Sequence, residues 1–243
     1  MSAPIIQARG LHKSFGPVTP ARDITVDIAE RSVVGLIGTN GAGKTTFVNM
    51  LTGYIRPDRG EILYRGKEIT GLASRKITRM GIARSFQIPQ LFVSQSVREN
   101  AEIALAIAGL PASDADEILD RLGVLEFAEH NCGKLPEGIR KLLDIAMAMV
   151  CKPQILLLDE PTSGVASEEK FDVMDRVLDT ARALGITVLF VEHDMDIVRR
   201  YSDRVLAFCD GRILADGGAE EVLANRDVRE LIIGETVQGE VHA

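Results

Sequence analysis

The chain has 243 residues, 46% of them hydrophobic, and a formal net charge of −7. This length suffices for one large domain or for a core with a subdomain, and the acidic balance argues against nucleic acid as a partner, because neutralising phosphates needs a basic face. The apolar runs are shorter than the ~18 residues of a membrane span, and residues 1–10 lack a charged region followed by an apolar one, so we expect neither a spanning helix nor a secretory signal.

Short apolar strands alternate with helical patterns at both ends of the chain, which predicts a parallel sheet of the α/β class. Near the N-terminus, three further strands are expected to form a small antiparallel sheet beside this parallel core: Ile5 to Ala8, Ile24 to Ile28 and Glu61 to Tyr64. The run Val33 to Ile37 predicts a buried strand, which is followed by a glycine-rich turn and a helix from Lys44 to about Leu51.

The pattern from residue 88 to residue 150 is helical. Ser96 with Glu99 forms a capping-box signature, Ser113 with Asp116 offers a second one, and Leu135 to Val150 carries apolar residues at helical spacing. We therefore predict a helical subdomain over 88–150, inserted between two parts of the core, 1–87 and 151–243.

The α/β alternation resumes after this insertion. The expected elements are a strand at Ile155 to Leu158, a helix from about Ser167 to Leu184, a strand at Thr187 to Val191, a helix through Val198 and a hairpin from Val205 to Leu214. Asp210 and Gly211 supply the two-residue turn of this hairpin.

The glycine-rich turn after Val33 to Ile37 fits the phosphate-binding P-loop pattern GxxxxGK[ST]. Glycines let successive backbone N–H groups converge on an anion, and the following helix points its positive end at the same place. The predicted nucleotide-binding residues are Gly38, Thr39, Asn40, Gly41, Ala42, Gly43, Lys44, Thr45 and Thr46. Lys44 is expected to reach the β- and γ-phosphates, and the Thr45 hydroxyl to ligate Mg²⁺; a glycine-rich turn that binds nothing is the alternative.

Polar residues follow two of the predicted buried strands. Asp159 and Glu160 come directly after Ile155 to Leu158, and His193 comes shortly after Thr187 to Val191. The C-terminal ends of parallel strands face the ligand crevice, so we expect Asp159 to hold Mg²⁺, Glu160 to act as base for an attacking water and His193 to donate to the γ-phosphate. The alternatives are a helix N-cap beside a surface charge, and a loop histidine.

These motifs resemble those of the ATP-binding subunits of ABC transporters, and the resemblance covers nearly all of residues 1–243. The strings GTNGAGKTT, ILLLDE followed by PTSG, and VEHD stand in that family's order and spacing. The resemblance implies a single ATPase domain of the P-loop NTPase type with a RecA-like core, ATP and Mg²⁺ as ligands, and ATP hydrolysis as the activity. It also implies that Gln87 contacts Mg²⁺ and water, and that Phe15 stacks on adenine; an N-terminal core aromatic is the alternative for Phe15.

Several segments are similar to those of importers of branched-chain amino acids and of urea or short amides. They are Gly81 to Gln87, Leu91 with Phe92, Ser96 to Asn100, and Asp227 to Glu235. This similarity implies a cytoplasmic subunit, peripheral on the inner face of the cell membrane, that drives membrane permease subunits and serves a solute-binding protein indirectly. The three widely spaced cysteines are consistent with a reducing compartment.

The sequence departs from the family on the surface offered to a second ATPase subunit. The usual LSGGQ signature is replaced by Leu135-Pro136-Glu137-Gly138-Ile139, and Ala166 stands where an aspartate is usual. Pro136 has neither a hydroxyl nor an N–H, and Glu137 brings a negative charge to a helix start that should face phosphate. We therefore expect a heterodimer with a different ATPase subunit; a regulatory or soluble ABC-type ATP switch with weak hydrolysis, and a small-molecule kinase, remain alternatives.

Overall fold

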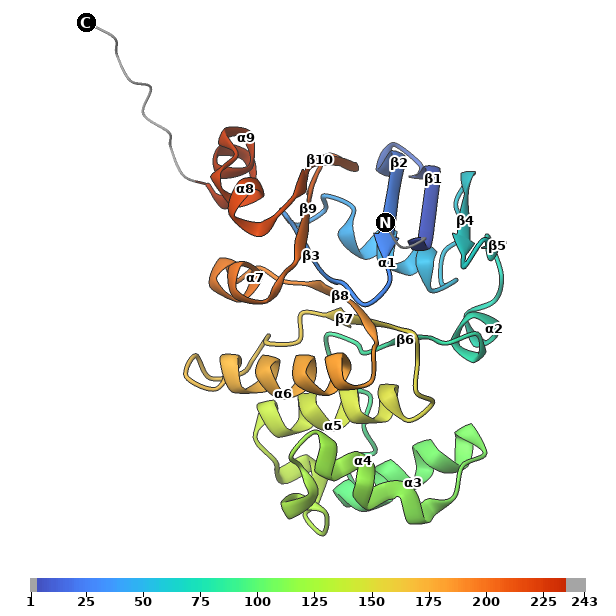
Figure 1. Ribbon diagram of the computed structural model, residues 1–243, viewed down its shortest axis with the longest axis vertical. Helices are drawn as coiled ribbons and strands as arrows, with labels where there is room; N and C mark the ends of the chain where they lie inside the picture. The colour runs from blue at the N-terminus through green and yellow to red at the C-terminus, as the bar shows by residue number, and fades with distance from the viewer. Residues whose placement is uncertain (1–3, 235–243) are drawn as a thin grey trace, which may run out of the picture. The chain divides into compact units, whose positions relative to one another are not determined.

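The computed structural model describes residues 4–234, and these divide into two compact units (Figure 1). The first unit holds the residues up to Ala73 and from His193 onward, and the second holds Ser74–Glu192. Glu235, the last residue of the predicted segment Asp227 to Glu235, lies outside the described residues. No helix within 4–234 is both long and apolar enough to cross a membrane.

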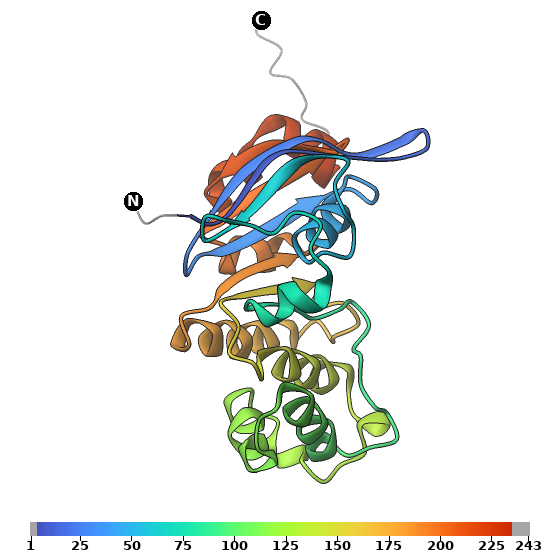
Figure 2. The ribbon, with the colours of Figure 1, turned by 90° about the vertical axis from the view of Figure 1, so that its right-hand side faces the viewer.

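The first unit contains the predicted antiparallel sheet, which is confirmed. Its strands lie side by side in the order β2-β1-β4-β5 (Figure 2). They are β1 (Pro4–Phe15), β2 (Val18–Ala29), β4 (Arg59–Tyr64) and β5 (Lys67–Glu68). Ile24, Val26 and Ile28 of β2 are buried and alternate with exposed residues, the period-2 pattern of a sheet with one buried face.

A second sheet of the first unit carries the glycine-rich turn. In it β3 (Val33–Gly38) pairs in parallel with β9 (Arg204–Cys209), which pairs antiparallel with β10 (Arg212–Gly217). The predicted hairpin is confirmed, since Asp210 (φ 47°) and Gly211 (φ 77°) are both left-handed, as a two-residue type I′ turn requires. The helical elements of this unit are α1 (Lys44–Leu51), α7 (Met195–Tyr201), α8 (Ala219–Ala224), α9 (Arg226–Val228) and a π-helical turn at Arg229–Ile233.

The second unit contains a parallel sheet in the order β8-β7-β6, formed by β6 (Ile82–Arg84), β7 (Ile155–Asp159) and β8 (Thr187–Val191). Its helices are α2 (Ser74–Arg79), α3 (Val97–Ala108), α4 (Ala115–Arg121), α5 (Glu137–Met149) and α6 (Lys170–Ala183). Helix α5 packs against α3, α4 and α6, and lies between α6 and the other two in Figure 1. Residues 88–150 belong to this unit together with the parallel strands, and their status as a separate subdomain stays a prediction.

The two expected capping boxes have different outcomes. At Ser96 the box is confirmed, because Glu99 N donates to Ser96 Oγ at 3.1 Å and Ser96 N donates to Glu99 Oε2 at 2.7 Å. The box of Ser113 with Asp116 is wrong. Pro111 is extended and starts a 3-10 turn at Ala112–Asp114, so Ser113 lies inside a turn, and α4 begins at Ala115 without a side-chain cap.

Candidate functional site

The glycine-rich turn of the first unit has the backbone of a P-loop. Strand β3 is buried along its whole length and ends at Gly38, and α1 begins at Lys44. Between them Gly41 (φ 81°) and Gly43 (φ 108°) adopt conformations that residues with a side chain rarely take, as does Gly38 (φ 150°). The turn therefore depends on glycine at 38 and 43, the two places where the P-loop pattern has it, and also at 41.

Close backbone packing adds a second reason for two of these glycines. A Cβ atom on Gly43 would lie 2.1 Å from the carbonyl oxygen of Pro20 in β2, and one on Gly38 would lie 2.4 Å from that of Phe208 in β9. The hairpin turn holds the loop as well, since Gly211 N donates to Ala42 O at 3.0 Å. Strands β2, β9 and β10 thus hold the loop in one shape.

Lys44 folds back over this loop. Its ammonium donates to Gly38 O at 2.6 Å and to Thr39 O at 3.1 Å, and the residue is 6% exposed. No side chain caps the N-terminus of α1 at Gly43, and Thr45 is exposed at its first turn while Thr46 is half-buried. The loop and the first turn of α1 therefore carry a cation, uncapped helix N–H groups and a hydroxyl, which is the donor set that a triphosphate needs.

Two other predicted residues of the first unit lie outside the loop. Phe15 is the last residue of β1 and is 50% exposed, with the Lys13 ammonium 5.3 Å from its ring centroid. An exposed ring is available for stacking and is no part of the core, which removes the core-aromatic alternative. His193 is exposed and precedes Asp194, whose carboxylate caps α7 by accepting from Asp196 N and Ile197 N.

In the second unit, strand β7 delivers the predicted acidic pair. Asp159 ends the strand, and its Oδ2 accepts a hydrogen bond from Arg84 Nη2 at 2.6 Å. The side chains of both residues are largely buried, 8% exposed for Arg84 and 12% for Asp159. The bond engages one carboxylate oxygen of Asp159 and leaves Oδ1 as an oxygen ligand of the kind that Mg²⁺ prefers.

Glu160 lies beside Gln87, for which the family resemblance implies contact with Mg²⁺ and water. The backbone of Glu160 is left-handed (φ 49°), and its N–H donates to Val191 O in β8 at 3.0 Å. Its Oε2 accepts from Gln87 Nε2 at 2.6 Å. A carboxylate at the end of a buried strand, held beside an amide that can orient water, is the arrangement that base-assisted hydrolysis requires.

Two buried charged residues of α5 complete this cluster and were not predicted. Lys141 Nζ donates to the backbone oxygens of Gln87 and of Glu160, the second at 3.2 Å. Asp144 accepts from Gln90 N at 2.8 Å and from Phe86 N at 3.4 Å. Burial lowers the pKa of Lys141 and raises the pKa of Asp144. A lysine and an aspartate three residues apart within the apolar face of Leu135 to Val150 are the signal that could have revealed them.

The turn after Glu160 is fixed by another residue that the sequence did not single out. Glu192 is buried, and its Oε1 accepts from Thr162 N at 3.0 Å and from Thr162 Oγ1 at 2.6 Å. These bonds tie the segment after β7 to the segment after β8, so the chain leaves both strands in one defined direction.

The segment in place of the usual signature begins α5. Leu135 is buried, Pro136 is exposed and caps nothing, and the Glu137 carboxylate pairs with Arg140 of the same helix. A Cβ atom on Gly164 would lie 3.3 Å from Glu137 Cγ, so the Glu137 side chain covers the loop that leads to Ala166. The negative charge expected at this helix start is therefore present, and it is offset by Arg140 next to it.

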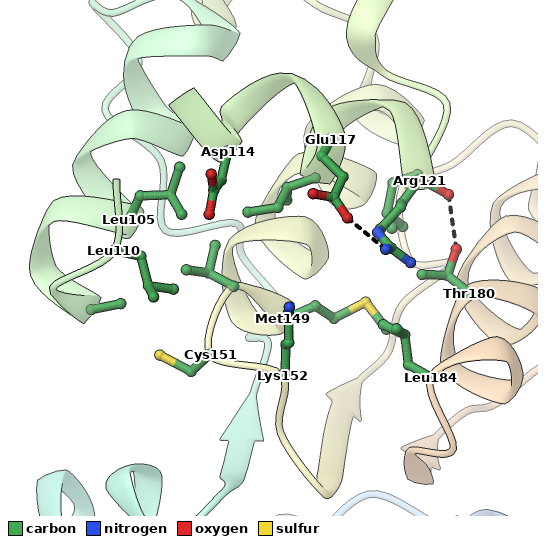
Figure 3. Close-up of a pocket in the computed structure, with 14 residues that line it drawn as sticks. Leu105, Leu110, Asp114, Glu117, Arg121, Met149, Cys151, Lys152, Thr180 and Leu184 are labelled. Carbon is green, nitrogen blue, oxygen red and sulfur yellow. Dashed lines mark hydrogen bonds and ion pairs between the residues drawn. The ribbon is translucent and has the colours of Figure 1, made fainter. Parts of the chain in front are cut away.

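A pocket of about 290 Å³ also lies in the second unit, among the ends of α3, α4, α5 and α6 (Figure 3). Its walls are largely apolar, and three of its polar residues bond to one another: Arg121 Nη2 donates to Glu117 Oε1 at 2.6 Å, and Thr180 Oγ1 donates to Arg121 O at 2.8 Å. None of the predicted site residues lines this pocket. Among the residues that the structure describes, no group of three or more His, Cys, Asp and Glu side chains could hold a metal ion.

Comparison with known proteins agrees with these motifs. The ABC transporter family model matches residues 21–163. LivG of Salmonella typhimurium and BraF of Pseudomonas aeruginosa, both high-affinity branched-chain amino acid transport ATP-binding proteins, are each 36% identical over 254 residues, which covers 97% of this chain and 100% of theirs. MetN of Brucella abortus, a methionine import ATP-binding protein, is 32% identical over 92% of this chain and 62% of its own length.

Solved structures give the same result. The ADP conformation of an ATP-binding cassette of an ABC transporter superposes with a TM-score of 0.88 at 30% identity, covering 96% of this chain and 100% of that one. A nucleotide-free ATP-binding cassette superposes with a TM-score of 0.87, also at 30% identity. The resemblance stated from the motifs is confirmed.

Proposed function

The chain belongs to the ABC transporter family of ATPases, and from that premise we propose that residues 38–46 bind ATP and that Gln87, Asp159, Glu160 and His193 act in its hydrolysis. ATP hydrolysis coupled to transport is its activity. The observation that carries the site proposal is the hydrogen bond between Gln87 and Glu160 at the end of the buried strand β7.

ATP binds with its phosphates on the loop 38–46. The backbone N–H groups of the loop and of the first turn of α1 donate to the phosphate oxygens, and Lys44 exchanges the carbonyls of Gly38 and Thr39 for the β- and γ-phosphates. Phe15 stacks on the adenine, for which its half-exposed ring is suited.

Glu160 takes the proton of the attacking water, and Gln87 orients that water. His193 donates a hydrogen bond to the γ-phosphate. Mg²⁺ prefers oxygen ligands, and three are proposed: the Thr45 hydroxyl, the amide oxygen of Gln87 and Oδ1 of Asp159. The bound ion would offset the charge of the β- and γ-phosphates. Arg84 holds Asp159 by its other carboxylate oxygen.

The transported solute is proposed from the relatives. LivG and BraF serve branched-chain amino acid transport and align over nearly the whole of this chain, so we propose an importer of branched-chain amino acids or related small polar solutes. In that role the chain is cytoplasmic and peripheral on the inner face of the cell membrane. It contacts permease subunits directly and depends on a solute-binding protein indirectly.

The partner ATPase is proposed to be a different subunit. Exposed Pro136 and Glu137, which pairs with Arg140, stand where the family offers a serine and a glycine to the partner's γ-phosphate, and Ala166 stands where an aspartate is usual. In a homodimer, each of the two intact P-loops would face an altered signature of the other subunit. A heterodimer supplies a good signature to this chain's own ATP.

Measuring phosphate release tests the proposed hydrolysis of ATP and the proposed heterodimer. We expect the purified chain to hydrolyse ATP slowly alone, and faster once a second ATPase subunit and the permease are added. Vigorous turnover by the chain alone would contradict the heterodimer. ATP binding without turnover in any combination would favour a regulatory switch, the alternative that the altered signature supports.

A further inference from the structure

Lys141 reaches from α5 into the proposed hydrolytic site. Its ammonium donates to the backbone oxygens of Gln87 and Glu160, and the residue is 2% exposed. We propose that Lys141 is a positioning residue for ATP hydrolysis, which holds Gln87 and Glu160 in the relative position that water attack needs. This inference rests on the proposed function, in which Glu160 is the base.

The backbone of Glu160 explains why it needs such support. A left-handed conformation (φ 49°) is sparsely populated for a glutamate and persists only where the surroundings hold it. The Glu160 N–H donates to Val191 O, and its carbonyl accepts from Ser163 N at 3.1 Å and from Lys141 Nζ at 3.2 Å. With both its N–H and its C=O bonded, the residue directs its carboxylate to Gln87, 2.6 Å from Nε2.

The same helix holds the Gln87 loop at a second place. Asp144, three residues after Lys141 on α5, accepts from the N–H groups of Phe86 and Gln90, which flank Gln87. Helix α5 therefore binds this loop through a cation at a carbonyl and through a carboxylate at two amides. Because α5 begins at Glu137, the segment offered to the partner subunit and the proposed base are joined through one rigid element.

Burying the ammonium of Lys141 in the core costs desolvation free energy. Burial lowers the pKa of Lys141, which reflects the desolvation of its charge. A methionine would fill similar space without that penalty, so a lysine at this position is explained by what its N–H groups hold. If Lys141 served packing alone, its replacement would change the stability of the fold. It would leave kcat for ATP unchanged relative to ATP binding.

The test uses the complete transporter and compares Lys141→Met with wild type. We expect kcat for ATP to fall by about tenfold to hundredfold, the scale of a displacement of about 1 Å at a reacting group, while KM for ATP changes by less than about threefold. Lys141→Arg, which keeps a cation with several N–H donors, should recover most of the loss. Lys152→Met is the matched control, because it removes the same charge from an exposed position beyond the end of α5, and it should retain wild-type turnover.

A double-variant cycle separates positioning from packing. If Lys141 acts through Glu160, then Lys141→Met adds little to the loss caused by Glu160→Gln, whereas independent effects multiply. Wild-type kcat in folded Lys141→Met, or equal falls in ATP affinity and kcat, would overturn the inference. Should Lys141→Met fail to fold, the same criteria apply to Lys141→Gln. The absence of phosphate release by wild type and Lys152→Met would instead refute the proposed function.

Discussion

Replacing Gly43 with alanine is expected to remove ATP binding by displacing the P-loop. The new Cβ atom would lie 2.1 Å from Pro20 O, about 0.9 Å closer than the 3.0 Å that real Cβ atoms respect. Pro20 lies within β2, a strand paired along its length with β1, so the loop must give way. A misplacement of about 1 Å costs about a hundredfold in catalytic rate, and we expect a loss of similar size in ATP affinity.

The loss of ATP affinity can be measured as a loss of the stabilisation that bound ATP gives to the fold. At an ATP concentration of about 100 times the wild-type Kd, ATP should raise the free energy of unfolding by about 2.7 kcal/mol; after a hundredfold loss of affinity the same concentration adds only about 0.4 kcal/mol. Thermal unfolding with and without ATP measures this difference, and titration with a fluorescent ATP analogue measures Kd directly.

Gly109→Ala is the matched control. Gly109 ends α3 with φ 72°, and an added Cβ would meet no heavy atom within 4 Å. Both variants carry the backbone strain of a left-handed alanine, about 1–2 kcal/mol, but only Gly43→Ala carries the collision with Pro20. Wild-type ATP affinity in Gly43→Ala, or an equal loss in Gly109→Ala, would refute the reasoning.

Three further substitutions probe other parts of the site. Lys44→Ala removes the ammonium that lies over the loop, and ATP affinity measured by titration should fall about tenfold to hundredfold; unchanged affinity would count against a phosphate role. Arg84→Met leaves the Asp159 carboxylate largely buried and unpaired, so urea denaturation should show a loss of about 3 kcal/mol, and a change below about 1 kcal/mol would contradict this. Burial raises the pKa of Asp144 above its usual 3.8, so the folded protein holds this proton more tightly than the unfolded chain. As pH rises from about 3.8 through the raised pKa, the unfolding free energy of wild type should therefore fall relative to Asp144→Asn and then level off; a relative rise with pH would be the opposite of the expectation.

The helices, strands and turns that were predicted correctly from the sequence have their determinants within a few neighbouring residues. Helix α1 occupies Lys44 to Leu51 as expected, because a glycine-rich turn fixes its start and a glycine follows its end. The Asp210-Gly211 turn and the strand ending in Asp159 were found for the same reason, since each carries its determinant within a few residues. The second capping box failed because Pro111 started a turn upstream of Ser113.

Contacts between residues far apart in sequence account for what was missed. Arg84 bonds Asp159 across 75 positions, and Lys141 bonds the Gln87 carbonyl across 54. The sequence placed Gln87 and Glu160 in one site through the family resemblance. It gave no means of knowing which buried side chains hold them, because that depends on how α5 packs in three dimensions.

The most direct test of the central claim is phosphate release by the complete transporter with Glu160→Gln in this chain alone, together with its ATP affinity. If Glu160 is the base, ATP should bind with wild-type affinity while hydrolysis at this chain's site falls by at least about a hundredfold. Near-normal hydrolysis at this site, measured with the partner subunit's own P-loop lysine replaced by alanine, would contradict the account.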